Sequence, residues 1–599
     1  METVSPFRLP RKTPFGVGEK LTEWATGLHR LSRFYADRPV GQDTESFLRY
    51  SLDVLGIDFH VVKGSYQNIP AQEAVVVVAN HPLGCAEGII LAQILRGIRP
   101  DVKILANHYL KTVPELDSLF IGVDVFEGES ALRANVKALR EANRHLSDGG
   151  LLLVFPAGEV SAYDRQSKQL RDKEWSKSVS RLIHKHKATT VPVFIGGRNS
   201  RHFYMAGKIH PMLRTLMLGR EMLNKQQSPV PIAIGDSIRF SEVKNISDDQ
   251  HLVNYLKFNT YLLGSQAGLI PSSTSASVVD TSKMAFSGEP IDAPVPLSLL
   301  KKDIASLGDD EWMLSSGEFD VYCARASQIP AILQELGRIR EINFRAVGEG
   351  TGKASDLDSF DESYLHLFVW DRQAEKIVGA YRLGLTDELI AKHGLEGLYS
   401  RTLFRYDERF ISQYGASIEL GRSVVAEEYQ RSLSALLLLW KGISAFVCRH
   451  PKYTHLFGPV SISDEYSHEA RQLLAACMSV HHADESSARL VAPTHPLSSN
   501  NRVFWQPDML SALADVQLLS RVISRMDAGK SVPVLLRQYL GLNGKLVCFN
   551  VDPEFNDALD GLIVVDLTQV PEKTLGKYMT PEKASAYLAH HGKVAGLTG

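Results

Sequence analysis

Residues 75–88 read VVVVANHPLGCAEG, and this stretch sets the fold of the first half of the chain. Four consecutive valines predict a strand buried on both faces, because β-branched side chains suit a covered, pleated surface. The strand ends at residues 80–82, and an apolar run with helical spacing follows near Glu87. His81 therefore stands at the carboxyl end of a buried strand, either as a structural histidine at a turn or as a catalytic base.

Further strands and helices alternate around this stretch. The segments VKILAN (102–107), GLLLVFP (150–156) and TTVPVFIGG (189–197) predict strands, and helical patterns lie between them. Such alternation is typical of an α/β domain with a largely buried sheet. Binding sites in these domains lie where loops leave the strand ends, which is where ANHPLG and FPAGEVS are expected.

The composition is that of an ordinary globular protein with several domains. The 599 residues are too many for one core, and the net charge is only −2. A balanced charge argues against general nucleic-acid binding, which needs a basic excess. The five cysteines lack metal-ligand spacing and are expected to be reduced thiols of a cytosolic protein. No apolar run reaches the roughly 18 residues of a transmembrane helix, so any membrane contact is expected at the surface.

A stretch rich in Ser, Pro, Ala and Gly divides the chain at residues 266–296 and predicts a linker. We expect an N-terminal helical segment over 1–54, an α/β domain over 55–265 and a second domain over 297–599. In the second domain, strands at 319–327, 364–371, 376–384 and 416–425 precede an apolar helix at 433–450. The short connection between the second and third strands predicts an antiparallel hairpin, and the whole pattern indicates an α+β fold.

Three ordered motifs in the first domain resemble the glycerolipid acyltransferase superfamily: NHPLGCAEG, FPAGEVS and VPVFIGG, within about residues 55–263. A histidine and a glutamate six residues apart are by themselves more often structural. The resemblance implies that His81 deprotonates an acceptor hydroxyl and that Glu87 takes the role of the family's aspartate. It also implies an acceptor site formed by Phe155, Pro156, Gly158, Glu159 and Ser161.

This sequence departs from the family pattern in ways that bear on the acceptor. The dyad spacing is one residue longer than usual and Glu replaces Asp, which puts the dyad geometry in question. Ala157 and Val160 stand where the family has an acidic residue and an arginine, and FIGVDVF (120–126) lacks another common arginine. Those arginines bind anionic phosphate headgroups. Their absence favours a zwitterionic acceptor over lysophosphatidic acid.

The second domain resembles the acyl-carrier-protein-dependent N-acyltransferases of the acetyltransferase-like superfamily, which include the ornithine N-acyltransferases. The resemblance spans about residues 319–463, with a tail to about 567, and rests on REINFRAVGEG, DLDSFDESYLHLFVWD, IVGAYRLG and IELGRSVV. It implies that Glu419 is the general base. Its implied amine-acceptor site consists of Arg345, Asp358, Asp361, Arg382, Glu419 and Arg422.

Two features of this second site follow from the residues themselves. Glu419 and Arg422 are three apart, which puts them on opposite faces of a regular strand unless a bulge realigns them. The loop QRSLSA (430–435) has Leu433 where coenzyme-A-binding loops need glycine for close approach to the pyrophosphate. This favours an acyl donor on a phosphopantetheine arm of acyl carrier protein, although an ordinary serine-capped helix start also explains the loop.

The two modules in this order resemble the bifunctional ornithine lipid synthases. The resemblance implies an α/β acyltransferase domain followed by an α+β acetyltransferase-like domain. It implies that the C-terminal half joins a 3-hydroxyacyl group to ornithine, and that the N-terminal half then acylates the 3-hydroxyl of the lyso-ornithine lipid. Expected partners are acyl carrier protein and a membrane surface, with no metal or redox cofactor and no nucleic acid. The expected location is cytoplasmic, on the inner face of the bacterial cell membrane.

Two alternatives remain open. In the first, the two steps are the same but the amine is lysine, glycine or glutamine. In the second, one half is inactive and serves as a platform that binds membrane or carrier protein.

Overall fold

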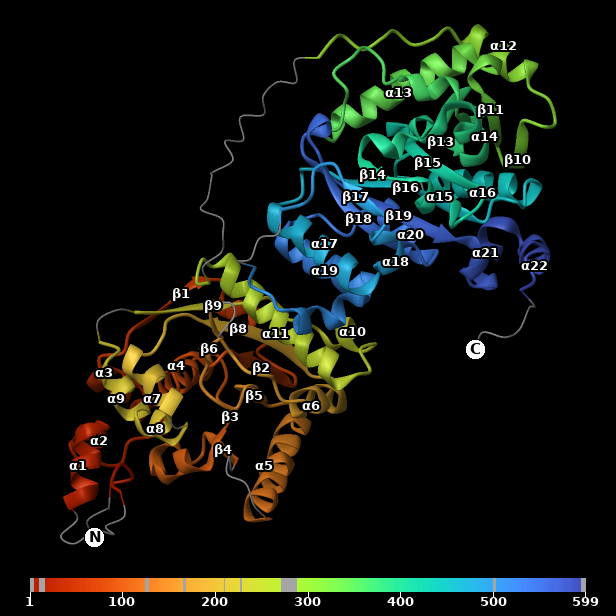
Figure 1. The fold of residues 1–599 in the computed structure, drawn as a ribbon. Coiled ribbons are helices and arrows are strands. Elements are labelled where there is room, and N and C mark those ends of the chain that lie inside the picture. Colours follow the sequence, from red (N-terminus) through yellow and green to blue (C-terminus); the bar gives the residue numbers. More distant parts are fainter. Residues whose placement is uncertain are drawn as a thin grey trace. The chain divides into compact units, whose positions relative to one another are not determined.

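The structure is a computed structural model and describes residues 5–9, 17–123, 129–164, 169–209, 211–226, 229–270, 288–431, 433–498 and 503–593. The chain forms two compact units (Figure 1). Unit 1 comprises residues 1–275 and 500–518, and unit 2 comprises residues 276–499 and 519–599. Residues 500–518 belong to unit 1 although they follow residues 276–499 of unit 2 in the sequence.

Unit 1 is built on a seven-stranded sheet of order β1-β9-β8-β2-β5-β3-β4. The neighbours from β8 to β4 run parallel, β9 runs antiparallel to β8, and β1 is parallel to β9. The strands are β1 (Phe59–Lys63), β2 (Val75–Ala79), β3 (Val102–Asn107), β4 (Phe120–Val123), β5 (Leu151–Val154), β8 (Thr189–Ile195) and β9 (Val230–Ile234).

Helices cover both faces of β2, as its unbroken run of valines predicts. Val75 and Val77 pack in a core cluster with Ile90 and Leu91 of α4 (Cys85–Arg96), and Val76, on the opposite side of the strand, is also fully buried. Helix α11 (Asp249–Gln266) lies on β8 and β2. The other helices of unit 1 are α1 (Val17–Ala25), α2 (Leu28–Ala36), α3 (Thr44–Leu55), α5 (Glu129–Ser147), α6 (Ser178–His186), α7 (Arg201–Ile209), α8 (Pro211–Leu216), α9 (Leu218–Leu223) and α10 (Phe240–Val243).

Leu21, Trp24, Leu28, Leu31 and Tyr35 are apolar residues at helical spacing, and the structure divides them between two helices. Gly27 adopts a φ of 78° between α1 and α2 and ends the first helix. Leu31 and Tyr35 of α2 are buried, whereas Leu21 and Trp24 of α1 are 66% and 73% exposed. Only the second part of this set therefore docks on the unit's own core.

Residues 503–518 pack on α11 within unit 1. The 3₁₀-helix η10 (Pro507–Ala514) lies against α11, where the Nδ2 of Asn254 donates to the carbonyl of Asp508 at 2.8 Å. The ring of Phe258 contacts both Phe504 and Trp505, with ring centroids 5.2 and 6.4 Å away. These contacts explain why α11 is buried nearly all round.

Unit 2 is built on an eight-stranded sheet of order β10-β11-β12-β13-β15-β16-β19-β18, antiparallel except for the β15–β16 pair. The β12–β13 pair is the predicted hairpin. The strands are β10 (Trp312–Ser316), β11 (Phe319–Arg325), β12 (Leu365–Asp371), β13 (Lys376–Leu385), β15 (Ser417–Val425), β16 (His455–Ile462), β18 (Lys545–Asp552) and β19 (Ala558–Asp566).

Two long helices cover opposite faces of this sheet. Phe368 and Trp370 of β12 belong to the core cluster formed with α13 (Pro330–Ala346). Leu367, which points the other way, meets Gly442 of α16 (Leu433–Arg449), where a Cβ on the glycine would lie 3.0 Å from the leucine. The remaining helices are α12 (Leu297–Ser306), α14 (Thr386–His393), α15 (Glu408–Ser412), α17 (His468–His481), α18 (Glu485–Ala488), α19 (Val516–Met526), α20 (Val534–Gly541), α21 (Glu572–Met579) and α22 (Pro581–His590).

No helix among the described residues is long and apolar enough to span a bilayer.

Candidate active sites

The end of β2 brings His81 and Glu87 together. Asn80 fixes the strand end, because its side chain exchanges two hydrogen bonds with the backbone of Ile195 on β8, at 2.9 and 2.7 Å. Gly84, with a φ of 93°, then turns the chain into α4, whose first turn carries Glu87. The six-residue spacing closes into a loop that places His81 Nδ1 2.7 Å from Glu87 Oε1.

Glu87 is completely buried and is held by the backbone of the same loop. Its Oε1 also accepts hydrogen bonds from the amides of Leu83 at 3.0 Å and Gly84 at 2.9 Å. A carboxylate only accepts, so Nδ1 of His81 carries the hydrogen and Nε2 keeps the lone pair. The His81 side chain is 18% exposed and is thus the member of the pair that a substrate can reach.

The surroundings of His81 raise its pKa. Burial by itself lowers the pKa of an imidazole, but the charge and hydrogen bond of Glu87, with a smaller contribution from Asp172, outweigh it. Arg214 on α8 acts in the opposite direction. The geometry and the raised pKa together suit a base that accepts a proton at Nε2 while Glu87 stabilises the imidazolium.

Asp172 is a member of this site that the motifs do not contain. Its Oδ1 accepts from the His81 amide at 3.2 Å and from the Ser161 hydroxyl at 2.5 Å, and its Oδ2 accepts from the indole N–H of Trp175 at 3.0 Å. The side chain is 4% exposed, and burial raises the pKa of its carboxyl group. In the sequence it lies in the charged run RDKE, which gives no signal of burial.

The FPAGEVS residues take different positions around the dyad. Phe155 stacks on the His81 ring with centroids 4.7 Å apart, and the amide of Ser161 donates to the His81 carbonyl at 2.7 Å. Gly158 has a φ of 67° in the turn, and the carbonyl of Pro156 accepts from the amide of Ser176 at 2.9 Å. The loop is therefore joined to His81 directly through its first and last residues.

Glu159, from the same loop, is paired with basic side chains. Its carboxylate lies 2.6 Å from Lys173 Nζ and 2.5 Å from Arg214 Nη2. Lys173 and Arg214 are two cations at this loop that the motifs do not include. Because Arg214 is already paired with Glu159, its presence does not by itself create an anion site.

In unit 2, the acidic loop predicted to hold an amine is part of a buried ion-pair network. Arg382 is completely buried, and its Nη1 lies 2.6 Å from Asp358 Oδ1 and 3.3 Å from Asp361 Oδ1. Burial alone raises the pKa of Asp361, but its two arginine neighbours lower it well below the usual range. The network contains three acids and three arginines: Asp356, Asp358, Asp361, Arg340, Arg382 and Arg422.

Equal numbers of acids and arginines neutralise this network internally. Arg340 contributes an ion pair of 2.8 Å with Asp361, and nearby His366 is neutral because burial and Arg340 lower its pKa to about 4. The carboxylates are thus already occupied by arginines. Arg345, by contrast, lies outside the network and binds Glu341 at 2.6 Å and the carbonyl of Glu289 at 2.9 Å.

Glu419 is 1% exposed and is held by three donors. Its carboxylate accepts from the amides of Tyr399 at 3.0 Å and Ser400 at 2.7 Å, and from the hydroxyl of Tyr364. Arg422 lies three residues farther along β15, in a bulge with a φ of 47°. This is the bulge considered from the sequence, because Arg422 and Ser423 together stand opposite Tyr381 of β13.

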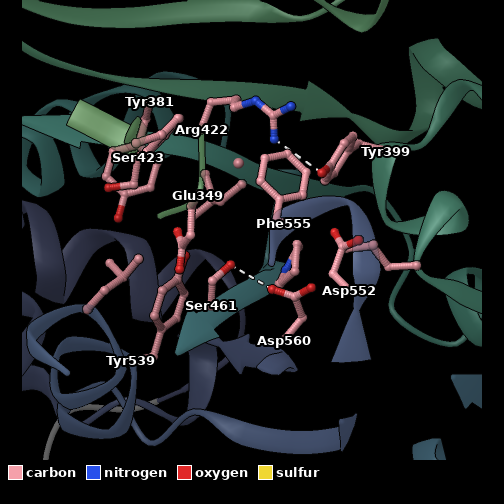
Figure 2. A pocket seen from close by; sticks show the side chains of 16 residues that line it. Glu349, Tyr381, Tyr399, Arg422, Ser423, Ser461, Tyr539, Asp552, Phe555 and Asp560 are labelled. Atoms are coloured by element: carbon pink, nitrogen blue, oxygen red, sulfur yellow. Dashed lines mark hydrogen bonds between the residues drawn. The ribbon is translucent and has the colours of Figure 1, made fainter. Parts of the chain in front are cut away.

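A fork in the sheet opens beside this bulge. Strands β15 and β16 pair only from Ser417 to Glu419 and then separate. At the branch point a Cβ on Gly458 would lie 2.1 Å from the carbonyl oxygen of Leu420, so only glycine fits. Beyond it lies a pocket of about 150 Å³, lined from β15 by residues 420–423 and from β16 by Pro459 and Ser461 (Figure 2).

Three carboxylates that the motifs missed or left unassigned line this pocket: Glu349, Asp552 and Asp560. Glu349 lies in the quoted motif REINFRAVGEG but was not assigned a role, and the other two belong to the tail, whose pattern does not fix its pairing. Of the predicted residues, Arg422 lines the pocket, whereas Glu419, Asp358, Asp361, Arg382 and Arg345 do not. The pocket thus joins one predicted residue to three side chains from elsewhere in unit 2.

Comparison with known proteins assigns both units to acyltransferases. Residues 44–268 match the family model described as acyltransferase, and residues 339–441 match that of the acetyltransferase (GNAT) domain. The predicted fold class, and the prediction that the chain is an acyltransferase, are therefore confirmed.

Individual relatives fall into two groups. A glycine N(alpha)-acyltransferase of Phocaeicola vulgatus is 30% identical over 302 residues, which cover 47% of this chain and 90% of the relative. A protein of Bacteroides thetaiotaomicron with the same description is 31% identical over 304 residues, covering 47% of this chain and 88% of the relative. A lyso-glycine lipid O-acyltransferase of Bacteroides thetaiotaomicron is 29% identical over 248 residues, covering 38% of this chain and 88% of the relative.

Proposed function

Because this chain belongs to the acyltransferase family that includes the glycine N(alpha)-acyltransferases, we propose that it makes a diacylated amino-acid lipid in two steps. Unit 2 transfers a 3-hydroxyacyl group to the amine of an amino acid. Unit 1 then transfers a second acyl group to the 3-hydroxyl of that product. The separate relatives for N-acylation and O-acylation support this division, since each is covered almost completely by part of this one chain.

The observation that carries the proposal is the His81–Glu87 pair at the end of β2. With Nδ1 bonded to Glu87 at 2.7 Å, Nε2 takes the proton of the acceptor hydroxyl as its oxygen attacks the carbonyl of the acyl thioester. The new C–O bond forms, the C–S bond breaks, and the imidazolium returns the proton to the departing thiolate, so that the carrier leaves as a thiol. Glu87 stabilises the imidazolium that forms. Asp172 fixes the His81 backbone and Ser161, and so positions the base against Phe155. The site suits a hydroxyl acceptor without a phosphate, because Arg214 is already paired with Glu159.

For unit 2 we propose that the acyl thioester lies in the fork between β15 and β16. Strands that separate leave backbone N–H and C=O groups that a ligand arm can use. The amine attacks the thioester carbonyl there, the C–S bond breaks, and the carrier leaves as a thiol. Glu419 stays our candidate base, and it also holds the backbone of Tyr399, which lines the pocket.

We propose acyl carrier protein as the donor, and no metal or redox cofactor. Helix α16 begins at Leu433, where a glycine-rich loop would be required to approach a pyrophosphate closely. A phosphopantetheine arm carries one phosphodiester and makes no such demand. Ser432, in the middle of this loop, lies outside the described residues.

We propose ornithine as the amine. The relatives are described as glycine N(alpha)-acyltransferases, so glycine is the principal alternative, and lysine and glutamine are further alternatives. We further propose that the protein works on the inner face of the bacterial membrane, where its amphiphilic product belongs. The exposed Leu21 and Trp24 of α1 would contact lipid there.

The test is mass spectrometry of total lipids from a bacterial host that makes no aminolipids. The intact chain should yield a diacyl ornithine lipid, and His81→Ala should stop at the monoacyl lipid. His60→Ala, which removes an exposed histidine of β1, is the matched control and should yield the diacyl product. A diacyl product from His81→Ala would refute the role of unit 1 and leave it as a binding platform. A different amino acid in the lipid would refute ornithine and keep the two steps.

A further inference from the structure

The pocket at the β15–β16 fork combines acidic groups that lack a cation. Among the described residues, no Lys, Arg or His nitrogen lies within 4.0 Å of a side-chain oxygen of Glu349, Asp552 or Asp560. Asp560 accepts from the hydroxyl of Ser461 at 2.6 Å, and Asp552 accepts from the amide of Glu554 at 3.0 Å.

The burial of these acids and their closeness to one another shift their pKa values. Burial, reinforced by the charges of the neighbouring acids, raises the pKa of Glu349 to about 7 and that of Asp560 to about 7. Burial also raises the pKa of Asp552. The Asp356–Asp358–Asp361 loop, which is equally acidic, is balanced by three arginines. The pocket acids therefore stand out as the ones that a bound cation would stabilise.

A second observation points independently to a polar ligand. Tyr381 is 1% exposed and lines the same pocket, and its hydroxyl lies near Ser423, Tyr539 and Trp440 without a hydrogen bond of good geometry among the described residues. A ligand with its own donors and acceptors can complete the hydrogen bonding of this hydroxyl.

The arginine that lines the pocket does not balance these three acids. Arg422 is already paired with Asp356 at 3.0 Å and Asp358 at 3.4 Å, and it donates to the Tyr399 hydroxyl at 3.1 Å, as drawn in Figure 2. A group of carboxylates without a paired cation suits an ammonium. Glycine has only one amine, and that amine must be neutral to react. Glycine therefore offers no ammonium that the three acids could bind.

From this arrangement, and resting on the proposed N-acylation in unit 2, we infer that Glu349, Asp552 and Asp560 bind the side-chain ammonium of a diamino acid. The three acids thus determine specificity for a dibasic substrate, and they do so from segments outside the predicted acidic loop.

The experiment measures binding to the full-length protein by calorimetry, with L-ornithine and L-norvaline as probes. Norvaline has the same carbon skeleton without the side-chain ammonium. Wild-type protein should bind ornithine at least tenfold more tightly than norvaline. Asp560→Asn and Glu349→Gln should each reduce this preference about tenfold or more, because a hydrogen bond to a charged group contributes about 1.5–3 kcal/mol. The control Asp557→Asn makes the same chemical change on an exposed residue nearby and should keep the preference.

The outcomes separate this inference from the proposed function. Equal binding of the two probes by the wild type, or an undiminished preference in both variants, overturns the inference. An N-acylated glycine lipid made without any ornithine preference also overturns it and leaves the two-step function standing. Absence of any acylated amine from the expressed protein refutes the proposed function, while the probe preference still decides whether the pocket recognises a second ammonium.

Discussion

The charge of Glu87 is the feature of unit 1 whose removal we predict in most detail. Glu87→Gln keeps the size of the side chain but replaces a buried carboxylate that faces His81 Nδ1 at 2.7 Å. A hydrogen bond to a charged group contributes about 1.5–3 kcal/mol, and this one strengthens as the imidazolium forms. O-acylation should therefore slow by about 10- to 150-fold, at about 1.36 kcal/mol for each factor of ten.

The same substitution should move the pH dependence of the reaction. Glu87 is the main group that raises the pKa of His81, while burial lowers it, so the variant histidine loses its proton at a lower pH. Since the base must be neutral to accept a proton, the rate rises with pH through the His81 pKa. In Glu87→Gln the midpoint of that rise should shift to lower pH, and the maximal rate at high pH should be lower than that of the wild type.

The assay follows transfer of a labelled acyl group to a 3-hydroxyacyl amino acid by purified full-length protein between pH 5 and 9. N-acylation by the same preparation is the internal control, because Glu87 belongs to the other unit. Glu45→Gln, on a half-exposed glutamate of α3, is the matched control for the chemical change. An unchanged rate together with an unchanged midpoint would refute the assignment of His81 and Glu87 as a catalytic pair.

Four further predictions concern the surrounding contacts. Asp172→Asn should slow O-acylation about tenfold and lower the melting temperature. The carboxylate accepts from three donors, and a buried donor left without its acceptor costs about 1–3 kcal/mol. An unchanged rate would exclude a positioning role. Arg382→Met removes one of the three arginines that balance the three acids of the buried network and should reduce the free energy of unfolding of unit 2 by about 3–5 kcal/mol in urea, with O-acylation retained. Glu419→Gln should reduce N-acylation by about 100-fold or more if the carboxylate is the base; a variant that is only less stable, with a normal rate per folded molecule, would show that Glu419 stabilises the fold and is not the base. The Asp560 carboxyl, with a pKa of about 7 against an ordinary 3.8, holds a proton that the unfolded chain has lost, so stability should fall as pH rises from about 4 to 7. Calorimetry at pH 5 and pH 8 should find this fall reduced in Asp560→Asn.

Features that depend on neighbours in the sequence could be predicted well. The valine run identifies β2, the turn after it brings Glu87 onto the first turn of α4, and the two members of the dyad are only six positions apart. The hairpin of β12 and β13 likewise follows from a short connection between two strand patterns. In each case the geometry is fixed by backbone periodicity and by a turn, both of which are local.

Features that depend on distant partners could not be predicted in the same way. The acidic loop around Asp358 has the pattern of an amine site, but Arg340, Arg382 and Arg422 come to it from three other elements and neutralise it. Asp172 gives no sign in its charged surroundings that it is buried behind His81.

The sequence by itself thus determined the two acyltransferase units, their order and the dyad at the end of β2, because strand and helix periods and short motifs record local geometry. Only the tertiary structure decided which charges are compensated. Whether a carboxylate is balanced by a buried arginine or left facing a pocket, as Glu349, Asp552 and Asp560 are, depends on distances between segments far apart in the chain. The pocket forms where β15 and β16 separate, and no local sequence pattern predicts that separation.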